Sequence, residues 1–206
     1  MPTDEARAAD RVTMPVVVVL AAGRGTRFNA DRTKLLALLR GKPVVAHAID
    51  CARRSHLPLK IVLANDAPRT LIDAVSILVE ARDIVWNANS ALGVTHSIAC
   101  GLAAAPDAAN WIVLPGDMPN VQPDDVRAVL RALDEPDVLA ARPTHAGEPG
   151  YPVGLSRRLG IDWSGSVASA GPLLLKALAH ARRIADCSPG VVQDVDTVAD
   201  LNGLAR

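Results

Sequence analysis

Short runs of apolar residues alternate with amphipathic segments along most of the chain, and this alternation constrains the fold more than any other feature. The first run, Val16–Leu20, consists only of valine and leucine, which is typical of a strand buried on both faces. Further strands are predicted at 59–64, 83–86, 111–114, 138–141 and 191–195, and helices at 43–52, 71–79, 94–102, 123–133 and 173–179. The alternation predicts an α/β fold in three layers, with a mostly parallel sheet and helices on both faces.

Local signals set the limits of several elements. Pro123 stands where a helix tolerates proline, in the first turn, and apolar residues then recur on one face. Thr197, with Asp200 three residues later, has the pattern of a capping box, so a last helix is predicted to begin there. Residues 143–172 are rich in glycine, proline and serine, and we expect this region to be irregular and to contribute to a site.

Length and charge narrow the classes of protein. At 206 residues, the chain is expected to form one domain. Lys plus Arg and Asp plus Glu number 22 each, so no net charge attracts nucleic acid or an anionic membrane. Aromatic residues make up only 2% of the chain, which leaves little for base stacking along a single strand. We therefore expect neither nucleic acid nor a membrane as a partner.

The first residues and the cysteines favour a cytoplasmic location. Residues 1–14 are polar and lack the apolar core of a signal peptide, and we expect a disordered extension there, before a domain at 15–206. The apolar stretch at 16–22 is too short to span a bilayer. Cys51, Cys100 and Cys187 form no CxxC pair, which argues against a zinc site or a disulfide framework.

A glycine-rich loop directly follows the first predicted strand. Its small residues allow backbone N–H groups to approach a ligand closely and to form a concavity that binds anions. Its two arginines and a lysine farther on supply the positive charge that a triphosphate needs. The candidate nucleotide-binding residues are Leu20, Ala21, Ala22, Gly23, Arg24, Gly25, Arg27 and Lys34.

Several kinds of phosphate-binding loop can be compared with this one. A Walker A loop requires GxxxxGK[ST], which is absent. A dinucleotide fingerprint requires GxGxxG, and Phe28 occupies the place of the third glycine. The signature loop of nucleotidyltransferases, LAAGxGxR followed by a lysine, resembles the sequence closely. A plain glycine-rich turn with solvated basic residues is the purely structural alternative.

Further motifs extend this resemblance through the chain. They stand at residues 34–36, 41–43, 93–102, 114–119, 150–153 and 194–197. With them the chain resembles the MobA-like NTP transferase family, and within it most closely the molybdenum cofactor cytidylyltransferases. The resemblance implies a three-layer fold related to dinucleotide-binding sheets, and transfer of CMP from CTP to the phosphate of molybdopterin. It also implies Mg²⁺ as cofactor, Ser97 as a nucleotide contact and a molybdoenzyme as recipient of the product.

Aspartates in two places are candidate metal ligands. Asp117 follows the predicted strand at 111–114, so it should lie at the carboxyl end of that strand, beside the glycine-rich loop. Mg²⁺ prefers oxygen ligands and usually bridges one or two carboxylates to substrate phosphates. Asp194 and Asp196 alternate on an extended segment and point to one face, so either can supply the second ligand, with Asp194 as first choice.

The negative charges of the two reactants define the roles expected of the site residues. An acceptor phosphate attacks the α-phosphorus and pyrophosphate leaves, so the site must screen repulsion between two anions and align them. Lys34 would neutralise the α-phosphate, Arg27 would hold the outer phosphates, and Mg²⁺ on Asp117 would bridge them. These three side chains are the candidate catalytic residues. Because a phosphate nucleophile is already ionised near neutral pH, no general base is needed, and His96 is interpreted as structural.

Two departures from the family pattern leave the acceptor open. Tyr151 stands where related cytidylyltransferases often carry histidine, and residues 165–172 lack the Asp and Arg of a GDxGAR-like segment. The alternatives are a transferase that uses GTP or another phosphorylated acceptor such as a sugar phosphate, and a non-catalytic, chaperone-like relative. Ala21 and Ala22 favour CTP, because guanylyl members often carry Ala–Gly–Gly at this place.

Overall fold

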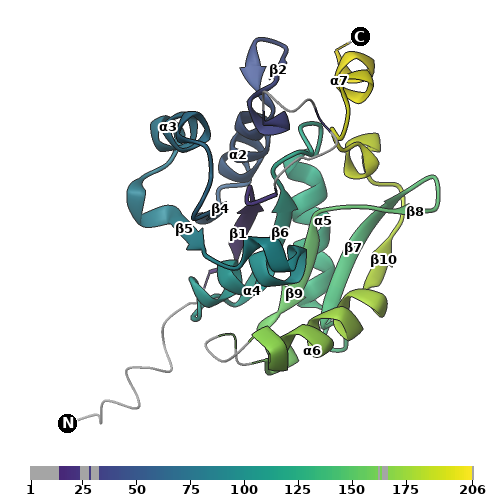
Figure 1. The fold of residues 1–206 in the computed structure, drawn as a ribbon. Coiled ribbons are helices and arrows are strands. Elements are labelled where there is room, and N and C mark those ends of the chain that lie inside the picture. The colour runs from purple at the N-terminus through teal and green to yellow at the C-terminus, as the bar shows by residue number, and fades with distance from the viewer. Residues whose placement is uncertain (1–13, 24–27, 29–32, 162, 164–166, 206) are drawn as a thin grey trace.

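The computed structural model is an α/β fold arranged around one large sheet (Figure 1). It describes residues 14–23, 28, 33–161, 163 and 167–205. The expected extension at 1–14 therefore falls outside the described residues except for Met14, and so do Arg24, Gly25 and Arg27.

The strands of the large sheet lie in the order β10-β7-β9-β6-β1-β4-β5, with β8 paired to β7. They are β1 (Val16–Leu20), β4 (Leu59–Ala64), β5 (Ile84–Asn87), β6 (Asn110–Pro115), β7 (Ala140–His145), β8 (Glu148–Pro149), β9 (Val153–Ser156) and β10 (Arg182–Ile184). β1 is parallel to both β4 and β6, β4 to β5, and β10 to β7, whereas β9 runs antiparallel between β6 and β7. The predicted, mostly parallel sheet is confirmed.

Helices follow the strands in the predicted alternation. They are α2 (Val44–Arg54), α3 (Arg69–Leu78), α4 (Val94–Ala103), α5 (Pro123–Asp134), α6 (Val167–Ala179) and α7 (Val198–Leu204). Short 3-10 turns occur at η1 (Lys34–Leu36), η2 (Ala81–Asp83), η3 (Ser90–Leu92), η4 (Arg157–Leu159) and η5 (Pro189–Val192), and a small hairpin joins β2 (Leu38–Leu39) to β3 (Lys42–Pro43). The capping box that the sequence predicts at Thr197 and Asp200 begins α7.

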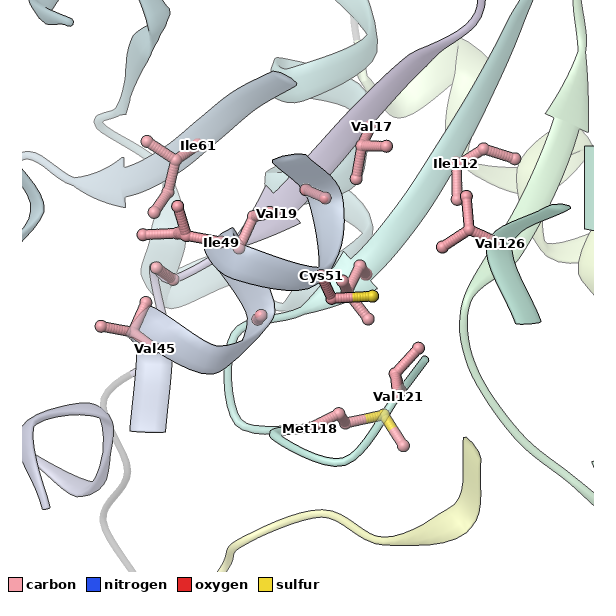
Figure 2. Packing of buried hydrophobic residues seen from close by; sticks show 14 of the residues in the cluster. Val17, Val19, Val45, Ile49, Cys51, Ile61, Ile112, Met118, Val121 and Val126 are labelled. Carbon is pink, nitrogen blue, oxygen red and sulfur yellow. The ribbon is translucent and has the colours of Figure 1, made fainter. Parts of the chain in front are cut away.

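The side chains of β1 divide the core into two layers. Val17 and Val19 pack in a cluster with residues of α2, α3 and α5, and Figure 2 shows the side chains of this layer around Ile49 and Cys51. Val16 and Val18 face the other way, toward α4 and α6. Because successive residues of a strand point to opposite faces, one continuous apolar strand holds helices on both sides. The predicted three-layer architecture is confirmed.

One glycine allows a helix to approach the sheet closely, as the pattern at 94–102 predicts. A Cβ atom on Gly101 of α4 would lie 2.3 Å from the Cγ1 atom of Val18, so any side chain there would displace α4 from β1. Within the residues that the structure describes, no helix is both long and apolar enough to cross a lipid bilayer.

The sequence prediction is wrong for several segments in the last third of the chain. The region predicted to be irregular contains the end of β7, the strands β8 and β9 and the start of α6. β10 was not predicted because its residues are polar and lie at the sheet edge, where no apolar pattern is required. The strand predicted at 191–195 is absent from the described structure. Its backbone bonds instead to loops, with Tyr151 N donating to Val191 O and Val195 N to Asp117 O.

Candidate nucleotide-binding site

The carboxyl ends of β1 and β6 meet at the centre of the sheet. In the register of the two strands, Leu20 lies opposite Pro115, and Gly116 N donates a hydrogen bond of 2.8 Å to Leu20 O. A Cβ atom on Gly116 would lie 2.9 Å from that same oxygen, so the close approach of the two loops requires glycine. The next residue, Asp117, therefore lies beside the glycine-rich loop, at the place where open α/β sheets bind ligands.

Lys34 lies between two carboxylates. Its Nζ atom is 2.5 Å from Oδ2 of Asp117 and 2.7 Å from Oδ1 of Asp196. The three side chains are 11%, 18% and 22% exposed, in the order Lys34, Asp117, Asp196, so water screens this cluster only partly. All three residues are predicted site residues, and the structure brings them together from three separate parts of the chain.

The cluster determines the charge of Lys34. Burial alone would lower the pKa of the ammonium, but hydrogen bonds and charge attraction from Asp117 and Asp196 outweigh burial, and the pKa of Lys34 is raised. Lys34 therefore stays a cation throughout the neutral range. Asp194 is exposed and lines a pocket together with Lys34, Asp117 and Asp196. Partial desolvation and then repulsion from Asp196 raise the pKa of its carboxyl group.

A buried apolar neighbour fixes each member of the cluster. Leu35 follows Lys34 and Met118 follows Asp117, and both lie in the core layer shared with α2 and α5, where Figure 2 places Met118 beside Val121. Val195 precedes Asp196 and is buried in a smaller cluster with Phe28, Leu39 and Val44. The backbone positions of the three charged residues are thus set by the core.

Polar contacts hold the segment before α7 against the loop after β6. Besides the bond from Val195 N to Asp117 O, Asn120 Nδ2 donates to Gln193 Oε1 over 2.9 Å. The buried carboxylate of Asp125 accepts hydrogen bonds from the backbone N–H and the hydroxyl of Ser188. Sequence reasoning missed these contacts, since they join residues whose spacing follows no motif.

Two pockets lie at this part of the molecule, one lined by Thr33 and the other by its neighbour Lys34. The smaller, of about 280 Å³, is lined by Ala21, Ala22, Gly23, Thr33, Ala64, Asp66, Ala67, Pro68 and Leu71. The larger, of about 590 Å³, is lined by Lys34, Pro115, Asp117, Met118, Glu148, Pro149, Gly150, Tyr151, Val191, Val192, Asp194 and Asp196. Ala21 to Gly23 of the glycine-rich loop therefore line one pocket, and the aspartates line the other.

The larger pocket has a wall built around Tyr151. The guanidinium of Arg142 lies 5.8 Å from the centre of the Tyr151 ring and donates hydrogen bonds to Gly150 O. Burial raises the pKa of the Tyr151 hydroxyl, so it is a neutral hydrogen-bonding group there. A further cavity of about 380 Å³, between α6 and the residues that lead into β7, contains none of the predicted site residues.

Ser97 lies away from the two pockets, and Asp66 is a pocket residue that the sequence motifs do not point to. Ser97 is buried on α4, where its hydroxyl accepts a hydrogen bond of 3.0 Å from Asn87 Nδ2, and it lines neither pocket at the cluster. Asp66 was not considered, although it follows β4 as Asp117 follows β6. The rule that ligands bind beyond the carboxyl ends of parallel strands would have found it.

The arrangement of carboxylates bears on metal binding. Across the described part of the chain, no three His, Cys, Asp or Glu side chains gather as a metal site. Asp117 and Asp196 nevertheless share one cation, the Lys34 ammonium, so their oxygens are close enough to bind the same ion. Because Mg²⁺ is often bound by one or two carboxylates with phosphate oxygens and water, this pair fits a metal that binds together with a nucleotide.

Known proteins resemble this chain over most of its length. The bifunctional protein GlmU of Xanthomonas oryzae pv. oryzae is 33% identical over 160 residues, which cover 77% of this chain but only 33% of that protein. The structure of Rv0371c from Mycobacterium tuberculosis H37Rv, also solved as a complex with manganese, superposes with a TM-score of 0.71 at 25% identity and covers 94% of this chain and 97% of the other.

A third similar structure is the molybdopterin-guanine dinucleotide biosynthesis protein A of Archaeoglobus fulgidus. It superposes with a TM-score of 0.65 over 92% of this chain and 96% of the other, and at 17% identity it supports the fold alone. The sequence itself matches the MobA-like NTP transferase domain over residues 17–184, a range that contains Lys34 and Asp117 but not Asp196. The chain therefore belongs to the MobA-like NTP transferase family.

Proposed function

We propose that residues 15–206 form a cytoplasmic transferase that moves CMP from CTP to the phosphate of molybdopterin and releases pyrophosphate. The observation that carries this proposal is the cluster of Lys34, Asp117 and Asp196 beside the loop that follows β1. A cation and two carboxylates next to clustered backbone amides suit a reaction between two phosphates, because the site must bind negative charge and a metal together.

The proposed roles of the residues follow from their charges. The backbone of Ala21 to Gly23 borders the smaller pocket and receives the nucleotide. Lys34, which follows Thr33 of that pocket and lines the larger one, neutralises the phosphate under attack. Asp117 and Asp196 would hold Mg²⁺, which would supply positive charge to stabilise the phosphates during transfer. Arg27 binds the outer phosphates. No side chain is needed as a general base, because the attacking phosphate is ionised already.

The larger pocket is the proposed acceptor site. Lys34 and Asp117 line it together with Tyr151, so an acceptor phosphate can lie beside the two charged side chains while its body contacts the wall around Tyr151. Molybdopterin is proposed because the motifs of the chain resemble those of the molybdenum cofactor cytidylyltransferases. Mg²⁺ is proposed as the divalent ion, by analogy with the manganese complex of the mycobacterial protein. A molybdoenzyme would then receive the product.

Ala21 and Ala22 support CTP as the donor. Both residues are buried and line the smaller pocket, where the nucleotide is proposed to bind. Related guanylyl transferases often carry Ala–Gly–Gly at this place, so the second alanine favours CTP. GTP is the second candidate, because the Archaeoglobus relative carries guanine in its name.

The test is pyrophosphate release from each of CTP, GTP, ATP and UTP with Mg²⁺, in the presence and absence of molybdopterin. We expect release with CTP only when the acceptor is present. Preference for another nucleotide would correct the donor, and activity only with a sugar phosphate would correct the acceptor. No release with any pair, despite nucleotide binding, would favour the non-catalytic alternative.

A further inference from the structure

The Lys34 ammonium occupies the place where two carboxylates converge. Asp117 and Asp196 each direct one oxygen to the same Nζ atom, at 2.5 and 2.7 Å. A metal ion bound by these two oxygens would take nearly the same position as the ammonium, because both oxygens already converge on it. Two cations cannot share it, because they would repel each other at short range in a partly buried site.

The proposed reaction assigns Lys34 a second position. To neutralise a nucleotide phosphate, its ammonium must leave the carboxylates and turn toward the glycine-rich loop. The structure allows this movement without a backbone change, since Leu35 is buried in the core and fixes the main chain while the lysine stem has four flexible carbons. Thr33, the preceding residue, already lines the nucleotide-side pocket.

We propose that Lys34 acts as an exchangeable internal cation: it neutralises Asp117 and Asp196 until a divalent metal replaces it, and the replaced ammonium then binds the nucleotide phosphates. This inference rests on the proposed function, since it assumes the metal role of the two aspartates. It makes metal binding and the positioning of Lys34 one event, so the nucleotide meets both cations only when the metal is in place.

The effect of removing Lys34 on metal affinity distinguishes the exchange from a fixed structural role. If the ammonium only holds the two carboxylates in position, its removal should loosen them and weaken metal binding. If it competes with the metal, its removal should strengthen metal binding, because a cation that competes for both carboxylates is lost.

The first experiment measures Mn²⁺ affinity by electron paramagnetic resonance, without nucleotide. We expect Lys34→Met to bind Mn²⁺ at least about threefold more tightly than the wild type. Lys60→Met is the matched control, because Lys60 forms a similarly shielded ion pair with Asp83 at 2.9 Å, and it should leave Mn²⁺ affinity unchanged. Equal or weaker binding in Lys34→Met overturns the exchange but leaves the transferase assignment intact. Absence of Mn²⁺ binding in both the wild type and Lys34→Met contradicts the role of Asp117 and Asp196 as metal ligands.

The second experiment follows Lys34 in the unaltered protein, so it does not depend on the folding of a variant. Lysine acetylation is timed by mass spectrometry with and without Mg²⁺. Displacement should raise the acetylation rate of Lys34 severalfold, while Lys60 and the exposed Lys42 keep theirs. An unchanged rate for Lys34 at saturating Mg²⁺ would show that the ammonium stays in place, and would overturn the proposal even if Lys34→Met binds Mn²⁺ more tightly.

Discussion

Lys34 and Asp196 are separated by 162 residues in the sequence, yet the Nζ atom of Lys34 donates a hydrogen bond of 2.7 Å to the carboxylate of Asp196. The contact joins the segment after β1 to the segment before α7, and Asp117, after β6, completes it. Because each residue comes from a different part of the chain, the cluster exists only in the folded protein. Substitution of each member should therefore have its own signature in stability and in activity.

Asp117→Asn should abolish the response to metal while the fold persists. The loop stays anchored by Met118 in the core and by the bond from Gly116 N to Leu20 O, neither of which uses the carboxylate. Turnover should fall by about 100-fold or more, the usual cost of removing one preorganised charge-stabilising group. The measurement is turnover against Mg²⁺ concentration, with the exposed Asp107→Asn as control. A wild-type magnesium curve for Asp117→Asn would remove this residue from the metal site.

Asp196→Asn and Asp194→Asn should change the stability of the metal-free protein in opposite directions. Asp196→Asn removes one charge that pairs with Lys34, and should lower the free energy of unfolding by about 1.5–3 kcal/mol, as for other hydrogen bonds to charged groups. Asp194 is not paired with Lys34 in the structure, and its carboxylate is destabilised by partial burial and by Asp196. Asp194→Asn should therefore raise the melting temperature at pH 7 in the presence of EDTA.

The increase in melting temperature expected for Asp194→Asn should depend on pH. The pKa of Asp194 is raised in the folded protein above its usual 3.8, so the folded state binds this proton more tightly than the unfolded state does. The charged carboxylate thus costs stability above the raised pKa, and this cost disappears as the pH falls below 3.8. Melting curves at pH 7 and near pH 4 should show the advantage of the variant shrinking. An advantage that grows on acidification would contradict the assignment.

The sequence predicted the central sheet well because its apolar runs report burial directly. Val16–Leu20 is buried on both faces, and the predicted run at 59–64 matches β4 in full. β9 was missed because its four residues include a glycine and a serine, and because nothing local signals that it inserts antiparallel between β6 and β7.

The candidate site was predicted in part. Lys34, Asp117 and Asp196 are predicted from motifs, but alternation along an extended segment leaves Asp194 and Asp196 both open as the second metal ligand, because it cannot distinguish two residues on one face. The structure pairs Asp196 with Lys34 because the neighbouring Val195 is buried under α2 and beside Phe28. That choice depends on packing between distant segments, and so does the Asp125–Ser188 contact.

Ser188→Ala should weaken both the fold and the site. The Ser188 hydroxyl donates a hydrogen bond of 2.7 Å to Asp125, whose carboxylate is buried. Its loss should lower the free energy of unfolding by about 1.5–3 kcal/mol, measured by urea titration. Since this contact holds the segment that carries Asp196, Mn²⁺ affinity should fall as well. The exposed Ser76→Ala on α3 should change neither quantity, and wild-type Mn²⁺ affinity in Ser188→Ala would show that the contact is only structural.

CTP and Mg²⁺ together should raise the melting temperature more than the sum of their separate effects. A ligand that binds only the native state stabilises it by mass action, by about 2.7 kcal/mol at a concentration of 100 Kd. CTP alone meets Lys34 already paired with Asp117 and Asp196, and Mg²⁺ alone lacks the phosphate oxygens that would complete its coordination. Each ligand therefore makes binding of the other more favourable, which is a positive coupling between the two sites.

Differential scanning fluorimetry at millimolar ligand, with each ligand alone and both together, measures this coupling. In Asp117→Asn the shift with both ligands should fall to that of CTP alone, whereas Asp107→Asn should keep it in full. Equal melting temperatures in all four conditions for the wild type would remove the nucleotide site altogether, and strictly additive shifts would mean that CTP and Mg²⁺ bind without sharing the Lys34 cluster.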